Sequence, residues 1–150
     1  MTSDQKRVLV VDDDSDIRKL LAAILRQREL IVDTASDGNT ALALVRDQRY
    51  AVVLLDLFMP GMDGFEVLRA LKEDEMSAPV VLVVTGADRQ TIARLDAAGI
   101  HGIVRKPFDP DELASLVLAC SEIRSRGAFG PMAIATVISG AQMLQWLVRS

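Results

Sequence analysis

The sequence predicts an α/β fold, doubly wound, with a five-stranded parallel sheet, and two observations support this. Short, continuous apolar runs rich in Val, Leu and Ile recur along the chain, bounded by polar residues. Between them lie stretches whose apolar residues recur every three or four positions. Runs of the first kind are typical of strands buried on both faces, and stretches of the second kind indicate amphipathic helices. Regular alternation of the two predicts a parallel sheet with helices on both faces.

The elements follow in order along the chain. The first strand is predicted at residues 8–11, followed by a helix with Ser15 as its N-cap, because Ile17, Leu20, Leu21, Ile24 and Leu25 share one helical face. The remaining strands are predicted at residues 30–34, 51–55, 80–84 and 102–104. The remaining helices are predicted at residues 41–45, 65–71, 91–98 and 110–123, the last with Pro110 in its first turn.

Composition limits the classes of function. The chain has 150 residues, half of them apolar, which suits one globular domain of ordinary size. Its net charge of -4 gives no basic footprint for nucleic acid. The single cysteine, Cys120, cannot form an internal disulfide, and the polar N-terminus lacks the pattern of a signal peptide. We therefore expect a cytoplasmic protein that does not bind nucleic acid.

Polar residues stand where the predicted strands end. They are Asp12, Asp13, Asp56, Thr85 and Lys106. Ligands of open α/β sheets bind beyond the carboxyl ends of the strands, so these side chains are expected to converge. Converging carboxylates need a cation between them, and Mg²⁺ prefers a few carboxylates together with waters and a phosphate oxygen. The pattern therefore favours phosphoryl transfer to a carboxylate, with positive charge from the metal ion and Lys106.

At this point the chain resembles a known family, the receiver domains of bacterial response regulators, including the chemotaxis regulators. The matching motifs are Asp12-Asp13-Asp14, then Asp56 with Met59-Pro60 and Asp63-Gly64, then Thr85-Gly86, and finally Lys106-Pro107-Phe108. One motif alone would be weak evidence, but four in the family's order and spacing are specific. The resemblance covers residues 6–125 and implies a flavodoxin-like sheet with the strand order 2-1-3-4-5.

The resemblance also implies roles for single residues. Asp56 is similar to the phosphoacceptor, and Asp12 and Asp13 are similar to the acidic pair that binds Mg²⁺ or Mn²⁺ together with Asp56. Phe58 would offer its backbone carbonyl to the metal. Thr85 is similar to the switch hydroxyl and Lys106 to the phosphate-binding lysine, which would precede a cis peptide bond to Pro107.

One position departs from the family pattern. The family usually has Tyr or Phe three residues before the lysine, where this chain has Ile103. An aliphatic side chain has no ring to turn inward, so phosphorylation would be reported by a different movement near Thr85 and Ile103. Structural interpretations of other polar residues are preferred: Asp14, Asp16 and Asp63 as caps or surface charges, and His101 as a satisfied or solvated side chain. Cys120 is expected in the core.

Residues 126–150 form a separate segment by composition. From Gly127 onward Arg149 is the only formal charge. Because the whole chain has a net charge of -4, the residues before Gly127 carry a net charge of -5. A helix is predicted over residues 131–148, with a broad apolar stripe. It would pack on the body or on a second copy, lead into further output sequence, or, as the least favoured interpretation, enter a membrane.

The predicted function is that of a regulatory phosphoacceptor domain and not of an enzyme with a separate substrate. Its expected partners are a sensor histidine kinase or a histidine phosphotransfer protein and a downstream protein target, with a homodimer through residues 131–148 as one form of output. A receiver-like scaffold that acts without phosphorylation is the alternative. An aspartyl-phosphate hydrolase is disfavoured, because such enzymes place a second carboxylate where this chain has Phe58.

Overall fold

The computed structural model describes residues 6–57, 59, 64–71, 79–86, 90, 100–125, 134–137 and 145–147. The strands are β1 (Arg7–Val11), β2 (Ile31–Ala35), β3 (Val52–Leu55), β4 (Val80–Thr85), β5 (Gly102–Arg105), β6 (Ile134–Val137) and β7 (Gln145–Leu147). The helices are α1 (Ser15–Gln27), α2 (Gly38–Asp47), α3 (Gly64–Leu71) and α5 (Pro110–Ser125). The helix predicted at residues 91–98 lies outside the described residues.

The strands form one sheet in the order β2-β1-β3-β4-β5-β6-β7. The first five are all parallel, which confirms the predicted order 2-1-3-4-5. The order reverses between β1 and β3, so the carboxyl ends of these two strands flank the point where ligands of such sheets bind. The topology therefore directs attention to the residues that follow Val11 and Leu55.

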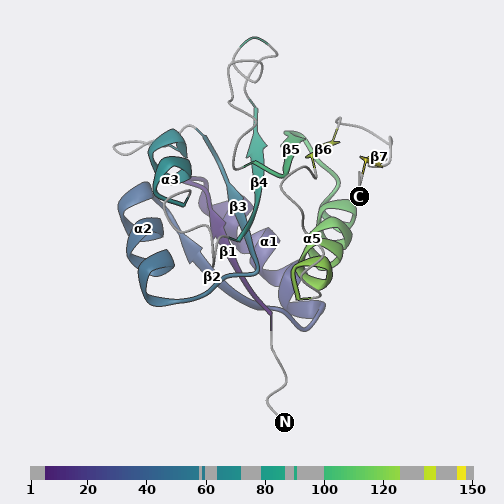
Figure 1. The fold of residues 1–150 in the computed structure, drawn as a ribbon, viewed down its shortest axis with the longest axis horizontal. Helices are drawn as coiled ribbons and strands as arrows, with labels where there is room; N and C mark the ends of the chain where they lie inside the picture. Colours follow the sequence, from purple (N-terminus) through teal and green to yellow (C-terminus); the bar gives the residue numbers. More distant parts are fainter. Residues whose placement is uncertain are drawn as a thin grey trace.

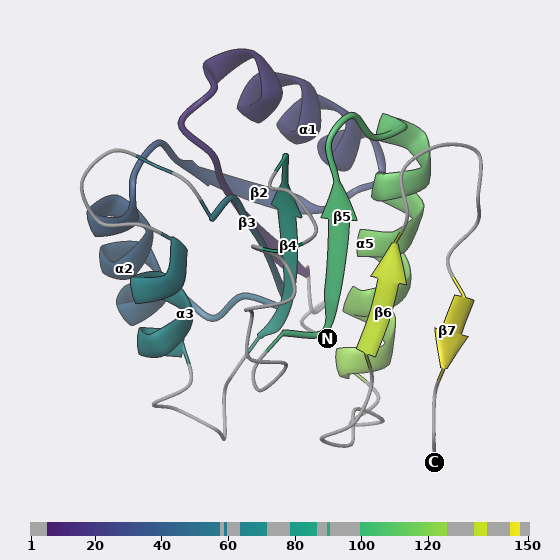
Figure 2. The same ribbon diagram turned by 90° about the horizontal axis from the view of Figure 1, so that it is seen from above.

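Helices cover both faces of the sheet, as Figures 1 and 2 show: α1 and α5 lie together on one face, and α2 and α3 lie together on the other. Successive strand residues point to opposite faces. Val8 and Val10 accordingly belong to the core cluster under α1 and α5, whereas Leu9 and Val11 belong to the cluster under α2 and α3. Because β1, β3 and β4 are buried on both faces, their sequences are continuously apolar except for Arg7 and Thr85 at the strand ends.

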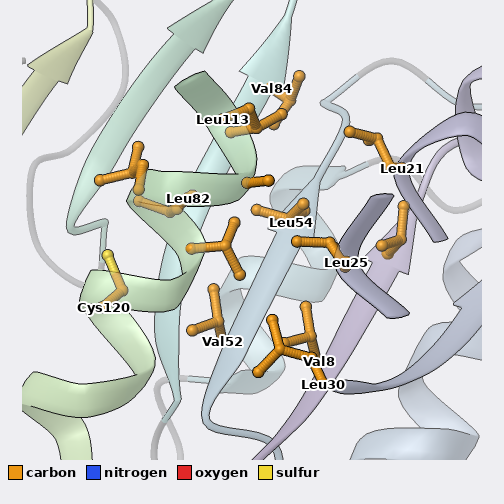
Figure 3. Close-up of a cluster of buried hydrophobic side chains, with 14 of the residues drawn as sticks. Val8, Leu21, Leu25, Leu30, Val52, Leu54, Leu82, Val84, Leu113 and Cys120 are labelled. Atoms are coloured by element: carbon orange, nitrogen blue, oxygen red, sulfur yellow. The ribbon is translucent and has the colours of Figure 1, made fainter. Parts of the chain in front are cut away.

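The cluster under α1 and α5 is shown in Figure 3, where Leu21 and Leu25 of α1 approach the strand residues Val8 and Leu54. Leu25 is fully buried, and burying a leucine side chain is worth about 1.5–3 kcal/mol. Cys120 lies in the same cluster, as predicted, and burial raises the pKa of its thiol to about 12. This cysteine is therefore a packing residue.

Local signals explain where the first two helices begin. The N-cap of α1 is Asp14, not the predicted Ser15, because the Asp14 carboxylate accepts hydrogen bonds from the amides of Asp16 and Ile17. Asp37 caps α2 in the same way, by accepting from the amide of Thr40 at 2.7 Å. The Asp14 cap places the start of α1 directly beside the turn that carries Asp12 and Asp13.

The helix predicted over residues 131–148 is wrong for the two described stretches of that segment, which are the strands β6 and β7. β6 pairs in parallel with β5, with Gly102 opposite Ala135 and Val104 opposite Val137, and β7 pairs antiparallel to β6. The physical reason is that β5 would otherwise leave an unpaired edge, and Ile134, Thr136 and Val137 are β-branched residues that suit a strand. The connection from β5 through α5 to β6 thus adds a further parallel crossover to the sheet (Figure 2).

Within the part of the chain that the structure describes, no helix is both long and apolar enough to cross a membrane.

Candidate phosphoacceptor site

Three carboxylates meet at the carboxyl ends of β1 and β3. Asp12 and Asp13 follow β1, and Asp56 follows β3. A ligand oxygen from each lies within 4.8 Å of the others. Asp12 and Asp56 are buried, whereas Asp13 is exposed. The convergence predicted from the strand ends is therefore what the structure shows.

Lys106 supplies a cation to this cluster from the end of β5. Its Nζ donates to Asp12 Oδ2 at 2.8 Å and lies 3.6 Å from Asp56 Oδ2. Burial lowers the pKa of Lys106, but the hydrogen bond to Asp12 and the charges of Asp56 and Asp12 outweigh it, so the net pKa is raised above its usual value. The lysine is therefore charged at neutral pH and lies between two of the carboxylates.

The backbone around Lys106 fixes where this ammonium group lies. The amide of Lys106 donates to the carbonyl of Thr85 at 2.9 Å, and the bond from Lys106 to Pro107 is cis, as predicted from the resemblance. Thr85, the last residue of β4, is fully buried. β4 and β5 therefore bring Thr85 and Lys106 to the same edge of the sheet as Asp56.

The structure does not test the roles predicted for Phe58 and Ile103. Phe58, the predicted backbone ligand, lies outside the described residues. Ile103 is part-buried on β5 and packs against the cluster under α2 and α3, with Val83 of β4 as its register partner. Its role as the switch position stays a prediction.

Gly64 was identified from the sequence only as part of the Asp63-Gly64 motif, and the structure gives it a steric role. A Cβ atom on Gly64 would lie 2.5 Å from the carbonyl oxygen of Asp56 and 2.6 Å from Cα of Leu57. The amide of Gly64 also donates to the carbonyl of Leu57 at 2.9 Å. Only glycine allows the start of α3 to approach the backbone of the central aspartate this closely.

Arg18 was missed altogether. Its Nη1 donates to the backbone carbonyl of Asp12 at 2.6 Å, which brings a guanidinium group next to the acidic cluster. One signal was present in the sequence: a cation near the start of a helix opposes the helix dipole, so an arginine there calls for an acceptor nearby.

His101 and Asp14 have structural roles, as predicted. Nδ1 of His101 accepts a hydrogen bond from the amide of Val81 at 3.0 Å, just before β5 begins. Asp14 is the cap described above, and Asp63 lies outside the described residues. The candidate chemistry therefore belongs to the cluster at the carboxyl end of the sheet.

The carboxylates suit a divalent cation. Two of the three are buried, one ammonium group among the described residues faces them, and hard oxygen ligands in this number are what Mg²⁺ takes from proteins. Like charges at such distances repel strongly unless a cation lies among them. These three carboxylates therefore fit a magnesium site.

Solved structures similar to this chain include response regulators and their receiver domains. One is the CheY-like response regulator receiver domain protein from Methanospirillum hungatei, with a TM-score of 0.72 and 27% identity over 81% of this chain and 98% of that one. Another is the response regulator TrrA from Thermotoga maritima in complex with Mg²⁺ and BeF, with a TM-score of 0.68 and 32% identity over 77% of this chain and 98% of that one. The class defined by fold and site is thus the receiver domain.

The family follows from the sequence comparisons. Residues 8–118 match the family model of the response regulator receiver domain, and the chain belongs to this family. The DNA-binding response regulator MtrA of Mycolicibacterium smegmatis is 37% identical over 79% of this chain and 52% of MtrA. The transcriptional regulatory protein ResD of Bacillus subtilis is 34% identical over 78% of this chain and 48% of ResD. The chain spans about half the length of these relatives, so the activities in their names belong to proteins with further sequence.

Proposed function

We propose that Asp56 is the phosphoacceptor of this receiver domain and that its phosphorylation switches a protein–protein contact. The observation that carries the proposal is the position of Asp56: a buried carboxylate at the end of β3, with two further carboxylates within 4.8 Å and Nζ of Lys106 at 3.6 Å. A carboxylate held beside a fixed cation is positioned to attack an electrophile that carries negative charge.

The proposed reaction is a displacement at phosphorus. A carboxylate oxygen of Asp56 forms a bond to phosphorus while the bond from phosphorus to the donor breaks, and the donor group leaves with the bonding electrons. The donor is a phosphohistidine of a histidine kinase or phosphotransfer protein, or a small acyl phosphate. Lys106 would contact one phosphoryl oxygen through Nζ, and the Thr85 hydroxyl would donate to another.

A divalent ion, Mg²⁺ in this proposal, would be held by Asp12, Asp13 and Asp56 and would offset the charge of the incoming phosphoryl group. The chain's own contribution is to fix those ligands. Asp12 is held by Lys106 at Oδ2 and by the amide of Asp14 at Oδ1, 2.9 Å away. Asp56 is held through its backbone, because its amide donates to the carbonyl of Val11 at 2.9 Å.

The test is intact-protein mass spectrometry after incubation with acetyl phosphate and Mg²⁺. The wild-type chain is expected to gain one phosphoryl group, and Asp56→Asn is expected to gain none. Asp33→Asn is the matched control, because it removes a half-buried carboxylate that lies away from the cluster. Unmodified wild-type protein would refute the phosphoacceptor role and favour the scaffold that acts without phosphorylation.

We also propose that residues 126–150 contribute to contact with another chain. In support, β7 is one of the two edge strands of the described sheet, and the segment from Gly127 onward contains no charged residue except Arg149. Sheet edges without charged residues are prone to pair with other strands, and a lysine on the edge opposes this. An isologous dimer is the simplest product of such pairing.

Native mass spectrometry over a range of concentrations, with and without acetyl phosphate, tests this contact. We expect a dimer that Leu147→Lys shifts to monomer, whereas Leu20→Lys does not. Leu20 is a suitable control because it is an exposed leucine on α1, with an exposed fraction of 45%. A wild-type chain that stays monomeric in every condition would exclude self-association as the output.

A further inference from the structure

Arg18 donates a hydrogen bond to the backbone of Asp12, and the proposed phosphoryl transfer assigns this arginine no role. Arg18 lies in the first turns of α1, and its Nη1 is 2.6 Å from the Asp12 carbonyl oxygen. Its side chain is only half exposed. The guanidinium group is thus held against the turn between β1 and α1 and does not extend freely into solvent.

This contact completes the restraint of Asp12. The amide of Asp12 donates to the carbonyl of Ala35 on β2 at 3.1 Å, and its two carboxylate oxygens accept from Asp14 and Lys106. The carbonyl is the remaining polar group of the residue, and Arg18 binds it. Every polar group of Asp12 therefore has a partner in the protein.

The restraint passes to Asp13 through the peptide bond. The Asp12 carbonyl and the Asp13 amide share one rigid plane, so the direction of the carbonyl limits the direction in which the Asp13 side chain leaves the backbone. Asp13 is exposed, so surrounding packing does not determine its position as it does for Asp12 and Asp56. The orientation of this peptide is accordingly the main restraint on the third carboxylate of the cluster.

We infer that Arg18 is a positioning residue for the metal ligands: by binding the Asp12 carbonyl it orients the Asp12–Asp13 peptide and so places the Asp13 carboxylate. The inference rests on the proposed function, in which these carboxylates bind Mg²⁺. Arg18 acts through the peptide and does not touch the phosphoryl group.

Removal of Arg18 changes Mg²⁺ affinity in opposite directions, depending on whether the residue acts through its charge or by placing Asp13. A guanidinium group close to a cation site repels the cation, so its removal strengthens Mg²⁺ binding if charge is all that matters. If Arg18 places Asp13, its removal weakens Mg²⁺ binding, and loss of a residue that orients metal ligands typically lowers affinity about 10- to 100-fold. The sign of the change therefore distinguishes the two roles.

The experiment is a titration of the full chain with Mg²⁺, followed by the amide resonances of Asp13 and Asp14 in nitrogen–proton NMR spectra. Arg18→Gln is expected to shift both resonances before metal is added and to weaken Mg²⁺ binding about tenfold. Lys19→Gln is the matched control, because it removes a neighbouring exposed cation of the same helix. It should leave the metal-free resonances unchanged and Mg²⁺ affinity equal or slightly stronger.

Equal or tighter Mg²⁺ binding by Arg18→Gln would overturn the inference. If the wild-type chain itself does not bind Mg²⁺, the proposed metal site fails, while the metal-free resonances of Arg18→Gln still report whether Arg18 orients the peptide. Should Arg18→Gln not fold, Arg18→Lys decides the question: it keeps the charge but shortens the reach, so weaker Mg²⁺ binding supports positioning and unchanged binding contradicts it.

Discussion

Near the point where β1 and β3 begin, one carboxylate, Asp33, accepts hydrogen bonds from Tyr50 at 2.7 Å and from Arg7 at 2.9 Å. At the opposite end of the same strands, three carboxylates share, within the described part of the chain, the ammonium group of Lys106. Both clusters are at least partly buried, and both combine aspartate carboxylates with a basic side chain. The difference between them shows which buried charges stabilise the fold and which are kept for binding.

The Asp33 cluster is balanced by its own neighbours. Burial raises the pKa of Asp33, but the hydrogen bonds from Tyr50 and Arg7 and the charges of Arg7 and Arg26 outweigh it, so the net pKa lies below its usual value. The same contact, together with burial, raises the pKa of Tyr50. The cluster at the carboxyl end keeps an excess of negative charge, which a cation from outside would balance.

The largest effect is expected where these carboxylates lose the ammonium group of Lys106. Lys106→Met leaves the buried Asp12 carboxylate without its ion-pair partner, so we expect the free energy of unfolding of the metal-free chain to fall by about 3 kcal/mol. Urea unfolding measures this. Added Mg²⁺ should restore part of the loss, and a variant as stable as wild type without metal would contradict the view that this end lacks internal balance.

Two glycine-to-alanine variants compare a position where a Cβ atom would meet the backbone with one where it would meet no atom. Gly64→Ala places a methyl group against the backbone of Asp56 and Leu57, and we expect it to lower the free energy of unfolding by about 1–3 kcal/mol and to slow phosphorylation. Gly86→Ala meets no atom within 4 Å and is expected to stabilise the fold by about 0.4–1 kcal/mol. Thermal unfolding and the rate of acetyl phosphate labelling test both, and equal effects of the two changes would show that the close approach at Gly64 is relaxed easily.

A smaller effect is expected at the balanced end. Tyr50→Phe removes one hydrogen bond to a part-exposed carboxylate, so we expect a loss of about 1 kcal/mol in stability at pH 7, with phosphorylation unchanged. Because the folded pKa of Asp33 lies below its ordinary value of 3.8, its contribution is present above that pH and is lost as the pH falls through the folded value. The Tyr50→Phe deficit in urea unfolding should therefore shrink as the pH falls below about 3.8. A deficit that is constant with pH would assign the loss to packing.

How much of this could be predicted differs from residue to residue. Asp12, Asp13, Asp56, Thr85 and Lys106 were found because strand ends are visible in the sequence as the points where apolar runs stop, and parallel strands bring those points together. Arg18 and Gly64 act through backbone atoms of other residues, and such contacts have no signature in residue type alone. The Asp14 cap was missed by one position, since neighbouring Ser15 is an equally good cap by type.

The C-terminal segment shows a different limit. Its apolar residues fit a helical stripe as well as they fit strands, so periodicity favoured the wrong element. What decides between them is the open edge of β5, a feature of the assembled sheet and not of the local sequence. The register of β6 against Gly102–Val104 depends on a surface that exists only after the first five strands have come together.

The parallel pairing of β6 with β5 has a consequence during synthesis. A chain made from its N-terminus completes β5 and α5 before residues 134–137 leave the ribosome, so the nascent sheet carries an unpaired β5 edge for that interval. Unpaired edges are where newly made chains join one another by mistake. The covering strand follows α5 in the chain, so the risk of mispairing at β5 lasts until residues 134–137 have been made.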